Sequence, residues 1–436
     1  MDTILNKAQA VKGEITVSAD KSISHRTLIL ASLAKGESQI RNLLKAEDTN
    51  STSSCLGQLG ITIKHKDDFL IVEGKGLRGM KEPESILDCG NSGTTMRLLS
   101  GLLSGQNFFS ILIGDESLSR RPMSRVIEPL RLMGAEIAGR ENSKYAPLAI
   151  KGTRLQGIIN KPAVASAQVK SALLLAGLTA EGDTIIIEKI PTRDHSERML
   201  AAMGADLMAD NGEIKLRPGK ELAPQEFMVP GDISSAAFFL VLATIVPGSQ
   251  LLIQDVGINP TRDGILEALL MMGANIKTEN RRVFGGEVVA DIIVSSADLK
   301  GITIEGDMIP RLIDELPVLA VAMAAAQGNS IVKNAEELRV KETDRISAIA
   351  NELGKMGVNI VEQADGFIIT GNRDNLRGAA VNSRGDHRIA MSLAVAAQIC
   401  DGETRINDSQ VVNISFPEFW NLLARVTGTN KGICSL

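Results

Sequence analysis

The stretch Asp20-Lys21-Ser22-Ile23-Ser24-His25-Arg26 runs directly into an apolar segment, residues 27–34. An Asp or Ser before an apolar run is typical of a helix N-cap, and a helix that is apolar on all sides belongs inside a core. The unpaired backbone N–H groups and the dipole at such a start favour an anion. Lys21 and Arg26 place full positive charges at the same end. The stretch therefore predicts a buried helix whose first turn binds a negatively charged group.

The same pattern recurs along the chain, which indicates a repeat protein. Polar or Gly-rich openings precede five further apolar runs, at Asn91-Ser92-Gly93-Thr94, Ala165-Ser166-Ala167-Gln168, Asp232-Ile233-Ser234-Ser235, Ile313-Asp314-Glu315-Leu316 and Asp386-His387-Arg388. Five of the six runs are followed by a segment that ends in Gly, at Leu56–Gly60, Leu130–Gly134, Leu200–Gly204, Leu269–Gly273 and Leu353–Gly357. The sixth copy is degenerate, with Phe419–Ala424 in this place.

Each of these five glycines is followed by an alternating, strand-like run such as Ala274-Asn275-Ile276-Lys277. Gly after a helix is a stop signal, and period-two alternation favours a strand. Each repeat is therefore predicted to hold strands and two helices, one buried and one amphipathic. Pro218, Pro224 and Pro230 cluster between the third and fourth repeats, which marks a crossing between two groups of three.

The predicted domains are residues 19–230, with repeats 1–3, and residues 1–18 plus 231–436, with repeats 4–6. The arm before Val17-Ser18 is open to either domain, and a strand that pairs with the far domain would make a second connection. Hydrophobic residues make up 44% of the chain and aromatic residues only 3%, so the core must be aliphatic. The formal net charge of −5 argues against general nucleic-acid binding.

Four cysteines, Cys55, Cys89, Cys400 and Cys434, form no zinc or redox motif, and so few thiols suit a reducing compartment. We find neither a secretory signal nor an apolar run long enough to cross a membrane. The sequence therefore predicts a cytoplasmic protein that binds neither membrane nor nucleic acid.

Several charged stretches are ambiguous when taken alone. In Arg339–Arg345 the cations Lys341 and Arg345 would share one face if the segment were helical, which suits either a bound anion or a salt-bridged helix start. Arg120–Arg125 suits either an anion site or an exposed basic loop, with Pro122 in the first turn of a helix. Asp314 and Asp194 could simply be helix caps.

Taken together, these stretches are more informative. Equivalent ends of repeated units should point to a common region, which we expect to be a cleft between the domains. The cleft would be strongly cationic, with Asp314 and Glu342 as isolated carboxylates, and would suit substrates that carry several negative charges. Its expected cations are Lys21, Arg26, Arg121, Arg193, Lys341, Arg345 and Arg388.

Five collinear stretches match the signatures of one family: Asp20–Arg26, Gly90–Thr94, Arg121–Met123, Arg339–Arg345 and Gly385–Met391. On these stretches, and over nearly its whole length, the chain resembles the 5-enolpyruvylshikimate-3-phosphate synthase family. The resemblance implies an α/β (α+β) fold of two domains, each with three βαβαββ repeats around buried parallel helices, in an inside-out barrel. It also implies transfer of the carboxyvinyl group of phosphoenolpyruvate to the 5-hydroxyl of shikimate-3-phosphate, with release of phosphate, in the shikimate pathway. We expect a monomer that needs no metal or organic cofactor.

The resemblance also implies roles for individual residues. Asp314 would be the base at the attacking hydroxyl, and Glu342, with Lys21, would serve the methylene carbon. The phosphoenolpyruvate ligands would be Lys21, Asn91, Gly93, Arg121, Gln168, Lys341, Arg345 and Arg388. The shikimate-3-phosphate ligands would be Lys21, Ser22, Arg26, Ser166, Ala167, Gln168, Arg193, Asp314 and Lys341. Cations on both sides of Glu342 should lower its pKa, which bound phosphate would offset.

The chain departs from the familiar family pattern in two places. Ile414 stands before Ser415-Phe416-Pro417, where many members carry Lys, so one phosphate ligand is missing. Ser166–Lys170 and Thr192–His195 resemble the branch that includes herbicide-tolerant members, with Arg193 in place of a serine contact. Gly93, however, stands where a tolerant member has alanine, and so leaves room for the inhibitor glyphosate.

Two alternatives remain, a sister enzyme with the same fold and a protein of a different functional class. The sister enzyme that transfers the same group to a UDP-amino sugar usually has a Cys or Asp acid on a mobile loop, whereas the segment Asp115–Arg121 has no Cys. A non-catalytic repeat scaffold would not need cations at the starts of buried helices. Release of phosphate from phosphoenolpyruvate with each acceptor would separate these alternatives.

Overall fold

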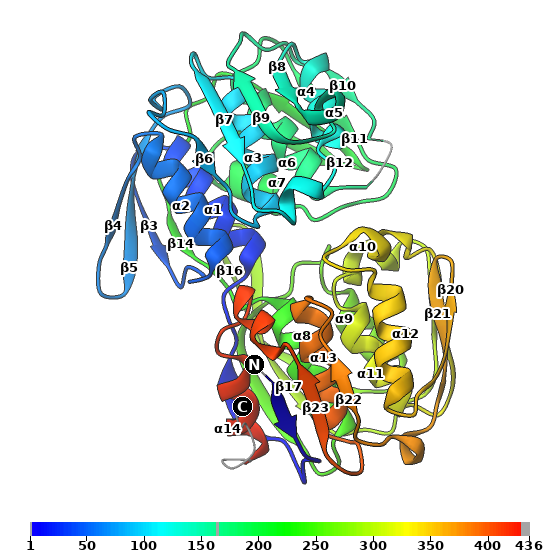
Figure 1. The fold of residues 1–436 in the computed structure, drawn as a ribbon. Coiled ribbons are helices and arrows are strands. Elements are labelled where there is room, and N and C mark those ends of the chain that lie inside the picture. The colour runs from blue at the N-terminus through cyan, green and yellow to red at the C-terminus, as the bar shows by residue number, and fades with distance from the viewer. Residues whose placement is uncertain (1, 163–164, 429–436) are drawn as a thin grey trace. The chain divides into compact units, whose positions relative to one another are not determined.

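The computed structural model describes residues 2–162 and 165–428, so Cys434 lies outside the described residues. The chain forms two compact units (Figure 1). Residues 19–229 and 283–287 form the repeat 1–3 unit, and residues 2–18, 230–282 and 288–428 form the repeat 4–6 unit.

In the repeat 1–3 unit, the helices are α1 (Lys21–Leu33), α2 (Glu47–Gln58), α3 (Gly93–Ser104), α4 (Ser124–Leu132), α5 (Arg140–Ser143), α6 (Ala167–Gly177) and α7 (His195–Ala202). The strands are β3 (Lys35–Arg41), β4 (Thr62–His65), β5 (Phe69–Lys75), β6 (Leu87–Asp88), β7 (Phe109–Ile113), β8 (Glu136–Gly139), β9 (Tyr145–Lys151), β10 (Ile159–Asn160), β11 (Thr184–Ile187), β12 (Asp206–Asp210), β13 (Glu213–Arg217) and β14 (Glu226–Met228).

In the repeat 4–6 unit, the helices are α8 (Ile233–Ile245), α9 (Gly264–Met271), α10 (Met308–Leu312), α11 (Leu316–Ala325), α12 (Arg345–Lys355), α13 (His387–Ala397) and α14 (Phe419–Thr427). The strands are β1 (Thr3–Leu5), β2 (Lys12–Thr16), β15 (Gln250–Gly257), β16 (Asn275–Phe284), β17 (Glu287–Ser295), β18 (Thr303–Ile304), β19 (Gly328–Val332), β20 (Asn359–Gln363), β21 (Gly366–Gly371), β22 (Ala380–Asn382) and β23 (Thr404–Asn407). The tip of the β16–β17 hairpin, residues 283–287, belongs to the repeat 1–3 unit.

The first helix of each repeat is buried, as the apolar runs predict. All 13 residues of α8 are buried, and in α11 every residue except Ala325 is buried. Such helices have no polar face to offer water, so they pack against one another. In one unit α8, α11 and α13 contact each other (Figure 1), and in the other unit α3 contacts α1 and α6.

The second helix of repeats 1–5 ends as its Gly predicts. Gly60, Gly134, Gly204, Gly273 and Gly357 all have φ between +84° and +96°. In each case the residue after the Gly donates its N–H to the carbonyl of the Leu four positions before the Gly, for example Val358 to Leu353 at 3.1 Å. This is the Schellman arrangement, in which two apolar side chains flank the left-handed residue. The Leu and Gly of each signature therefore act together to end the helix.

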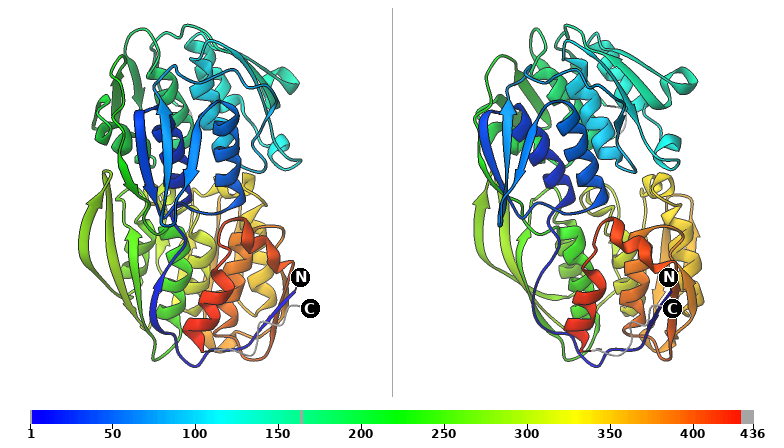
Figure 2. Two further views of the ribbon diagram at one scale, coloured as in Figure 1. Left: turned by 90° about the vertical axis from the view of Figure 1, so that its left-hand side faces the viewer. Right: turned by 60° about the vertical axis from the view of Figure 1, so that its left-hand side comes forward.

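The sheets repeat a single plan. Five sheets have four strands each, and in every one a parallel pair at one edge is followed by antiparallel neighbours. The helices of a repeat lie on its sheet, as α1 does on β5 and α2 on β4 (Figure 2). The βαβαββ fold predicted from the resemblance is thus confirmed.

Strands β2 and β14 each pair in one unit although the helix that follows them belongs to the other unit. Strand β2 leads into α1, yet it pairs in parallel with β15 of the repeat 4–6 unit. Strand β14 leads toward α8, yet it pairs in parallel with β3 of the repeat 1–3 unit. The chain therefore passes between the units twice here, after Ser18 and after Val229.

The degenerate sixth repeat is completed by the start of the chain. Strand β1 pairs antiparallel with β23, and β22 pairs with the other edge of β23, which gives a sheet of three strands. Helix α14 stands where a second helix is expected, and its Phe419 packs edge to face on Phe238 and Phe416. Aromatic packing thus gathers around this repeat in an otherwise aliphatic core.

A buried polar chain joins α1, α2 and α3. His25 Nδ1 lies 2.7 Å from Thr52 Oγ1, which lies 2.6 Å from Thr95 Oγ1, and Thr95 donates to Ser92 Oγ at 2.7 Å. His25 is fully buried, and this burial lowers its pKa to about 3. The imidazole is therefore neutral at ordinary pH.

We expect Gly357→Ala to lower the free energy of unfolding by about 1–2 kcal/mol or more, because a Cβ at φ +87° is strained and would lie 2.4 Å from the Asn375 carbonyl oxygen. Gly354→Ala, in the same helix, is the matched control, since its Cβ would meet nothing within 4 Å. We expect this control to raise stability by about 0.5–1 kcal/mol. Urea unfolding measures both, and equal effects would contradict the left-handed assignment.

We expect stability to fall as the pH drops below about 6.5, because the unfolded chain then binds a proton on His25 that the folded state does not bind until about pH 3. The loss from this residue is about 1.4 kcal/mol per pH unit within that window. His25→Gln should flatten the dependence measured by urea unfolding. The exposed His65, changed to Gln, is the control, and equal slopes for His25→Gln and the parent would refute the assignment.

Candidate functional site

The starts of five buried helices carry the caps that the sequence predicts. The cap oxygen accepts a backbone N–H at 2.8 Å for Asp20, 3.1 Å for Ser92, 3.5 Å for Ser166, 2.9 Å for Asp232 and 2.8 Å for Asp386. Helix α11 is the exception, because Glu315 stands at its N-cap position and makes no side-chain cap bond. The simple capping role considered for Asp314 is therefore wrong.

In the repeat 1–3 unit, Arg26 is buried among serines. Its Nε donates to Ser196 Oγ at 2.8 Å and its Nη2 to Ser171 Oγ at 2.7 Å, while Nη1 donates to the Ser22 carbonyl at 3.0 Å. Burial lowers the pKa of Arg26 to about 10. These three partners are uncharged, so the guanidinium retains a strong attraction for an anion.

Lys21 lies at the start of the same helix. Its Nζ is 3.2 Å from Asp48 Oδ2, and about a quarter of its side chain is exposed. A partly exposed ammonium group that pairs with one carboxylate keeps donors available for a second anion.

The starts of α3 and α6 are linked by side chains. Gln168 Nε2 donates to Thr94 Oγ1 at 3.0 Å, and Gln168 Oε1 accepts from Arg97 Nη1 at 2.6 Å. Gly93 is the first residue of α3, and a Cβ added there would lie 2.8 Å from Arg97 Nη1. Gly93 therefore leaves the space in which Arg97 reaches Gln168.

Nearby, Arg121 Nη2 donates to Asn91 Oδ1 at 2.8 Å, and Asn91 Nδ2 donates to Asp115 Oδ2 at 2.7 Å. Two further predicted residues frame this unit: Ala167 opens α6, and Arg193 lies two residues before α7. The structure thus places all the predicted residues of repeats 1–3 at or near helix starts of a single unit.

In the repeat 4–6 unit, Arg345 forms ion pairs with three carboxylates. Its Nη1 lies 3.3 Å from Asp314 Oδ1, and its Nη2 lies 2.7 Å from Glu342 Oε2. Its Nε lies 2.7 Å from Asp386 Oδ2. Burial alone would lower the pKa of this guanidinium, but the three carboxylates, Asp386 foremost, raise it above its ordinary value. Arg345 is thus a permanent cation that holds Asp314 and Glu342 close to one another.

Two more predicted cations contact Asp314. Lys341 Nζ lies 3.5 Å from Asp314 Oδ1, and Arg388 Nη1 donates to the Asp314 carbonyl at 2.9 Å. Arg388 also lies 3.6 Å from the buried Glu315 carboxylate. The expectation of isolated carboxylates is therefore wrong: Asp314 and Glu342 are both ion-paired in this cluster.

Two local expectations are also wrong. Lys341 and Arg345 do not share a helical face, because a 3₁₀ turn ends at Val340, Lys341 is extended, and Asp344 caps α12 by accepting from Ser347 N at 3.1 Å. Pro122 precedes the N-cap of α4 and so lies outside its first turn. Both helices thus begin later in the sequence than expected, α12 at Arg345 and α4 at Ser124.

Asp194 is the N-cap residue of α7, as the sequence suggests. Its side chain makes no cap hydrogen bond, and its carboxylate accepts instead from Arg198 Nε at 2.8 Å. Ile414, at the usual Lys position, ends a 3₁₀ turn in the repeat 4–6 unit.

Several buried charged residues around these clusters are not among the site residues that the sequence predicts. Arg97 and Lys170 lie within apolar helices, and Glu315 lies next to the predicted base. A charged residue inside an apolar run was the signal available, since such a residue is buried only when it is paired. Spacing alone could not name the partners, which come from other repeats.

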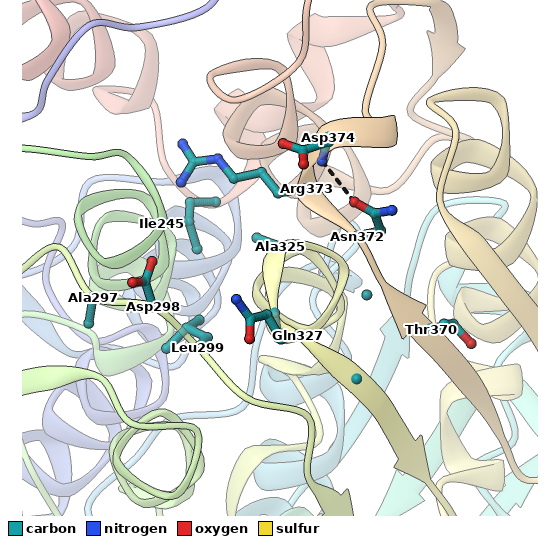
Figure 3. Close-up of a pocket in the computed structure, with 13 residues that line it drawn as sticks. Ile245, Ala297, Asp298, Leu299, Ala325, Gln327, Thr370, Asn372, Arg373 and Asp374 are labelled. Carbon is teal, nitrogen blue, oxygen red and sulfur yellow. Dashed lines mark hydrogen bonds between the residues drawn. The ribbon is translucent and has the colours of Figure 1, made fainter.

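A cavity of about 450 Å³ lies elsewhere in the repeat 4–6 unit (Figure 3). It is lined by Ile245, Ala297, Asp298, Leu299, Ala325, Ala326, Gln327, Gly328, Thr370, Gly371, Asn372, Arg373 and Asp374. Ile245 and Ala325 are the last residues of α8 and α11, whereas the charged cluster lies at the starts of helices. The cavity holds none of the predicted site residues.

Within residues 2–162 and 165–428, no group of three or more His, Cys, Asp or Glu side chains is placed to hold a metal ion. Among the helices of the described chain, none is long and apolar enough to span a membrane. The charged clusters hold paired carboxylates, which can exchange protons, and arginines and lysines, which can bind anions.

Comparisons with known proteins agree with this chemistry. The family model of EPSP synthase (3-phosphoshikimate 1-carboxyvinyltransferase) matches residues 5–423. A 3-phosphoshikimate 1-carboxyvinyltransferase of Syntrophomonas wolfei is 60% identical over 98% of this chain and 100% of its own length. The corresponding protein of Geotalea daltonii is 52% identical over 96% of this chain and 98% of its own length.

Solved structures give the same result. The EPSP synthase of Acinetobacter baumannii matches with a TM-score of 0.89 and 44% identity, covering 98% of each chain. The enolpyruvyl transferase NikO of Streptomyces tendae matches with a TM-score of 0.80 at 16% identity over 98% of this chain and 97% of its own, which supports the fold alone. The cation and carboxylate clusters, the six repeats and these matches together show that the chain belongs to the EPSP synthase family.

Proposed function

We propose that this protein transfers the carboxyvinyl group of phosphoenolpyruvate to the 5-hydroxyl of shikimate-3-phosphate and releases phosphate, as a step of the shikimate pathway that leads to chorismate and aromatic amino acids. The observation that carries the proposal is the pair of carboxylates, Asp314 and Glu342, held by the single buried guanidinium of Arg345. Addition across an enol double bond needs a base at the attacking oxygen and an acid at the far carbon. Two neighbouring carboxylates provide both.

The steps balance with these groups alone. Asp314 takes the proton of the 5-hydroxyl as its oxygen bonds to the central carbon of phosphoenolpyruvate, and Glu342, helped by Lys21, gives a proton to the methylene carbon. In the second step Glu342 takes a proton back from the resulting methyl group, the double bond re-forms, and the C–O bond to phosphate breaks. The departing phosphate takes the proton that Asp314 had accepted, which restores the Asp314 carboxylate. Arg345 stays charged throughout, so it stabilises negative charge without exchanging protons.

Both substrates are anions, and each is assigned a set of cationic and polar ligands. Phosphoenolpyruvate is assigned to Lys21, Asn91, Gly93, Arg121, Gln168, Lys341, Arg345 and Arg388. Shikimate-3-phosphate is assigned to Lys21, Ser22, Arg26, Ser166, Ala167, Gln168, Arg193, Asp314 and Lys341. A guanidinium with uncharged partners, as at Arg26, suits the sugar phosphate because an anion there meets no competing carboxylate among those partners.

The proposal needs no metal or organic cofactor, since every proton transfer has a named side chain. A monomer in the cytoplasm, without nucleic-acid partners, remains our prediction. The cleft in which the two sets of ligands would meet also remains a prediction.

We expect Asp314→Asn and Glu342→Gln each to lower kcat by about 10²–10⁴-fold, the usual contribution of a positioned acid or base. The assay is phosphate release from phosphoenolpyruvate with shikimate-3-phosphate as acceptor. Because each variant keeps its size and most hydrogen bonds, substrate KM values should change much less than kcat.

Glu305→Gln is the matched control, since Glu305 pairs with Lys333 on the surface of the same unit, and its kcat should equal that of the parent. Unchanged kcat in both site variants would refute the assigned roles. Release only with a UDP-amino sugar would replace the acceptor, and no release with either acceptor would favour a binding scaffold.

We expect Gly93→Ala to raise the KM for phosphoenolpyruvate by roughly tenfold, because the new methyl group displaces Arg97 from Gln168 and a hydrogen bond to a charged group is lost. Steady-state kinetics with varied phosphoenolpyruvate measures the change. Gly57→Ala is the control, since its Cβ would meet nothing within 4 Å.

The same variants test the herbicide hypothesis. The parent should be inhibited by glyphosate, and Gly93→Ala should be inhibited less than Gly57→Ala. If Gly93→Ala bound glyphosate as tightly as the parent, the crowding argument would be wrong.

A further inference from the structure

A buried lysine in the repeat 1–3 unit is not used by the proposed mechanism. Lys170 lies on α6 with only 1% of its side chain exposed. Its Nζ lies 2.7 Å from Glu197 Oε1 and 2.9 Å from Glu188 Oε2, and it donates to the Thr192 carbonyl at 3.3 Å. Both carboxylates are nearly as buried as the lysine, at 5% and 8% of their side chains. Burial of a cation with two carboxylates costs desolvation free energy, so a stability role alone does not account for this cluster.

The first consequence of these contacts concerns Arg26. Lys170 and Ser171 are adjacent on α6, and Ser196 and Glu197 are adjacent on α7. The ion pair between Lys170 and Glu197 thus lies next to the hydrogen bond between the two serine hydroxyls, 2.7 Å long. Both serines accept from Arg26. The ion pair therefore fixes the two partners that orient this guanidinium.

The second consequence concerns the loop that carries Arg193. Glu188 accepts from Thr192 twice, from the backbone N at 3.4 Å and from the hydroxyl in a short hydrogen bond. Lys170 contacts both Glu188 and the Thr192 carbonyl, so the residue immediately before Arg193 is held on three sides. The backbone position of Arg193 thus depends on Lys170.

The third consequence is electrostatic. Burial raises the pKa of Glu197, and Lys170 opposes that rise. Glu197 is also the carboxylate whose charge raises the pKa of Arg26 most, while Arg193 lowers it. Its second oxygen, Oε2, is buried and makes no hydrogen bond within the described part of the chain. Without Lys170, the negative charge of Glu197 would be balanced by Arg26 and Arg193. It would then compete with a bound phosphate for these two arginines.

We propose that Lys170 is a positioning residue for the phosphate group of shikimate-3-phosphate, because it fixes the partners of Arg26 and the loop of Arg193 and neutralises two carboxylates beside them. The inference rests on the proposed function, which supplies the phosphate ligand. Lys170 itself touches neither substrate in this scheme. It determines affinity for the phosphorylated sugar acid and leaves the proton transfers, which belong to Asp314 and Glu342, unchanged.

The test is Lys170→Met in the full chain, with phosphate release and calorimetric binding as readouts. We expect the KM for shikimate-3-phosphate to rise by roughly tenfold or more, with kcat and the KM for phosphoenolpyruvate changed less than about twofold. Binding of shikimate, which lacks the phosphate, should be nearly unchanged. A purely structural role would weaken both sugar acids alike. Lys215→Met, which removes a surface pair with Asp183 in the same unit, is the control and should change none of these quantities.

Two more variants keep the test decisive if Lys170→Met folds poorly. Thr192→Val removes one hydroxyl contact with Glu188 and should raise the KM for shikimate-3-phosphate in the same selective way. Adding Glu197→Gln to Lys170→Met removes the competing charge and should restore part of the affinity.

The outcomes separate the two proposals. A parent protein that releases no phosphate in the presence of shikimate-3-phosphate would overturn the proposed function. An active parent whose Lys170→Met and Thr192→Val variants keep the same ratio of shikimate-3-phosphate to shikimate affinity would overturn the role of Lys170 alone.

Discussion

A helix that is buried on every side meets polar groups only at its ends, and this constraint governs the molecule. The first helix of each repeat has an apolar surface, so its unpaired backbone N–H groups must be satisfied by residues just before it. Asp20, Ser92 and Asp386 are such residues. Because the helices of a unit pack together, their polar starts are the natural places for charge. The architecture therefore places charged and polar side chains together at these helix starts.

Burial also explains why the charged groups come in networks rather than singly. An unpaired buried charge costs several kcal/mol, so each cation needs carboxylates or oriented hydroxyls. Arg345 meets three carboxylates and is locked in its charged form, whereas Arg26 meets hydroxyls and keeps its attraction for an anion. The two arginines are similarly buried, and their partners give them different chemistry.

The sequence predicts the repeats well because their signals are local. Leu353 and Gly357 end a helix through their own backbone, and Asp20 caps one through its own side chain. The positions of individual charged residues are harder to predict. The spacing of Lys341 and Arg345 suits one helical face, but Asp344 caps the helix after Lys341 and leaves that residue outside it. Lys170 was missed because its partners, Glu188 and Glu197, lie beyond the end of its helix. Ion pairs between side chains of different elements depend on how those elements pack, and a local sequence pattern does not predict that packing.

The pairing of β2 and β14 bears on how the chain is made. The repeat 1–3 unit is an almost continuous stretch, so it has nearly all its strands once residue 229 has been synthesised. The repeat 4–6 unit is interrupted by it, because β2 pairs with β15 and β1 pairs with β23, Thr3 opposite Ile406. Strands β1 and β2 are therefore synthesised long before β23 and β15, the strands with which they pair. Until β23 is synthesised, β1 has no strand to pair with. An unpaired strand can associate with another chain, so this stage of synthesis carries a risk of aggregation.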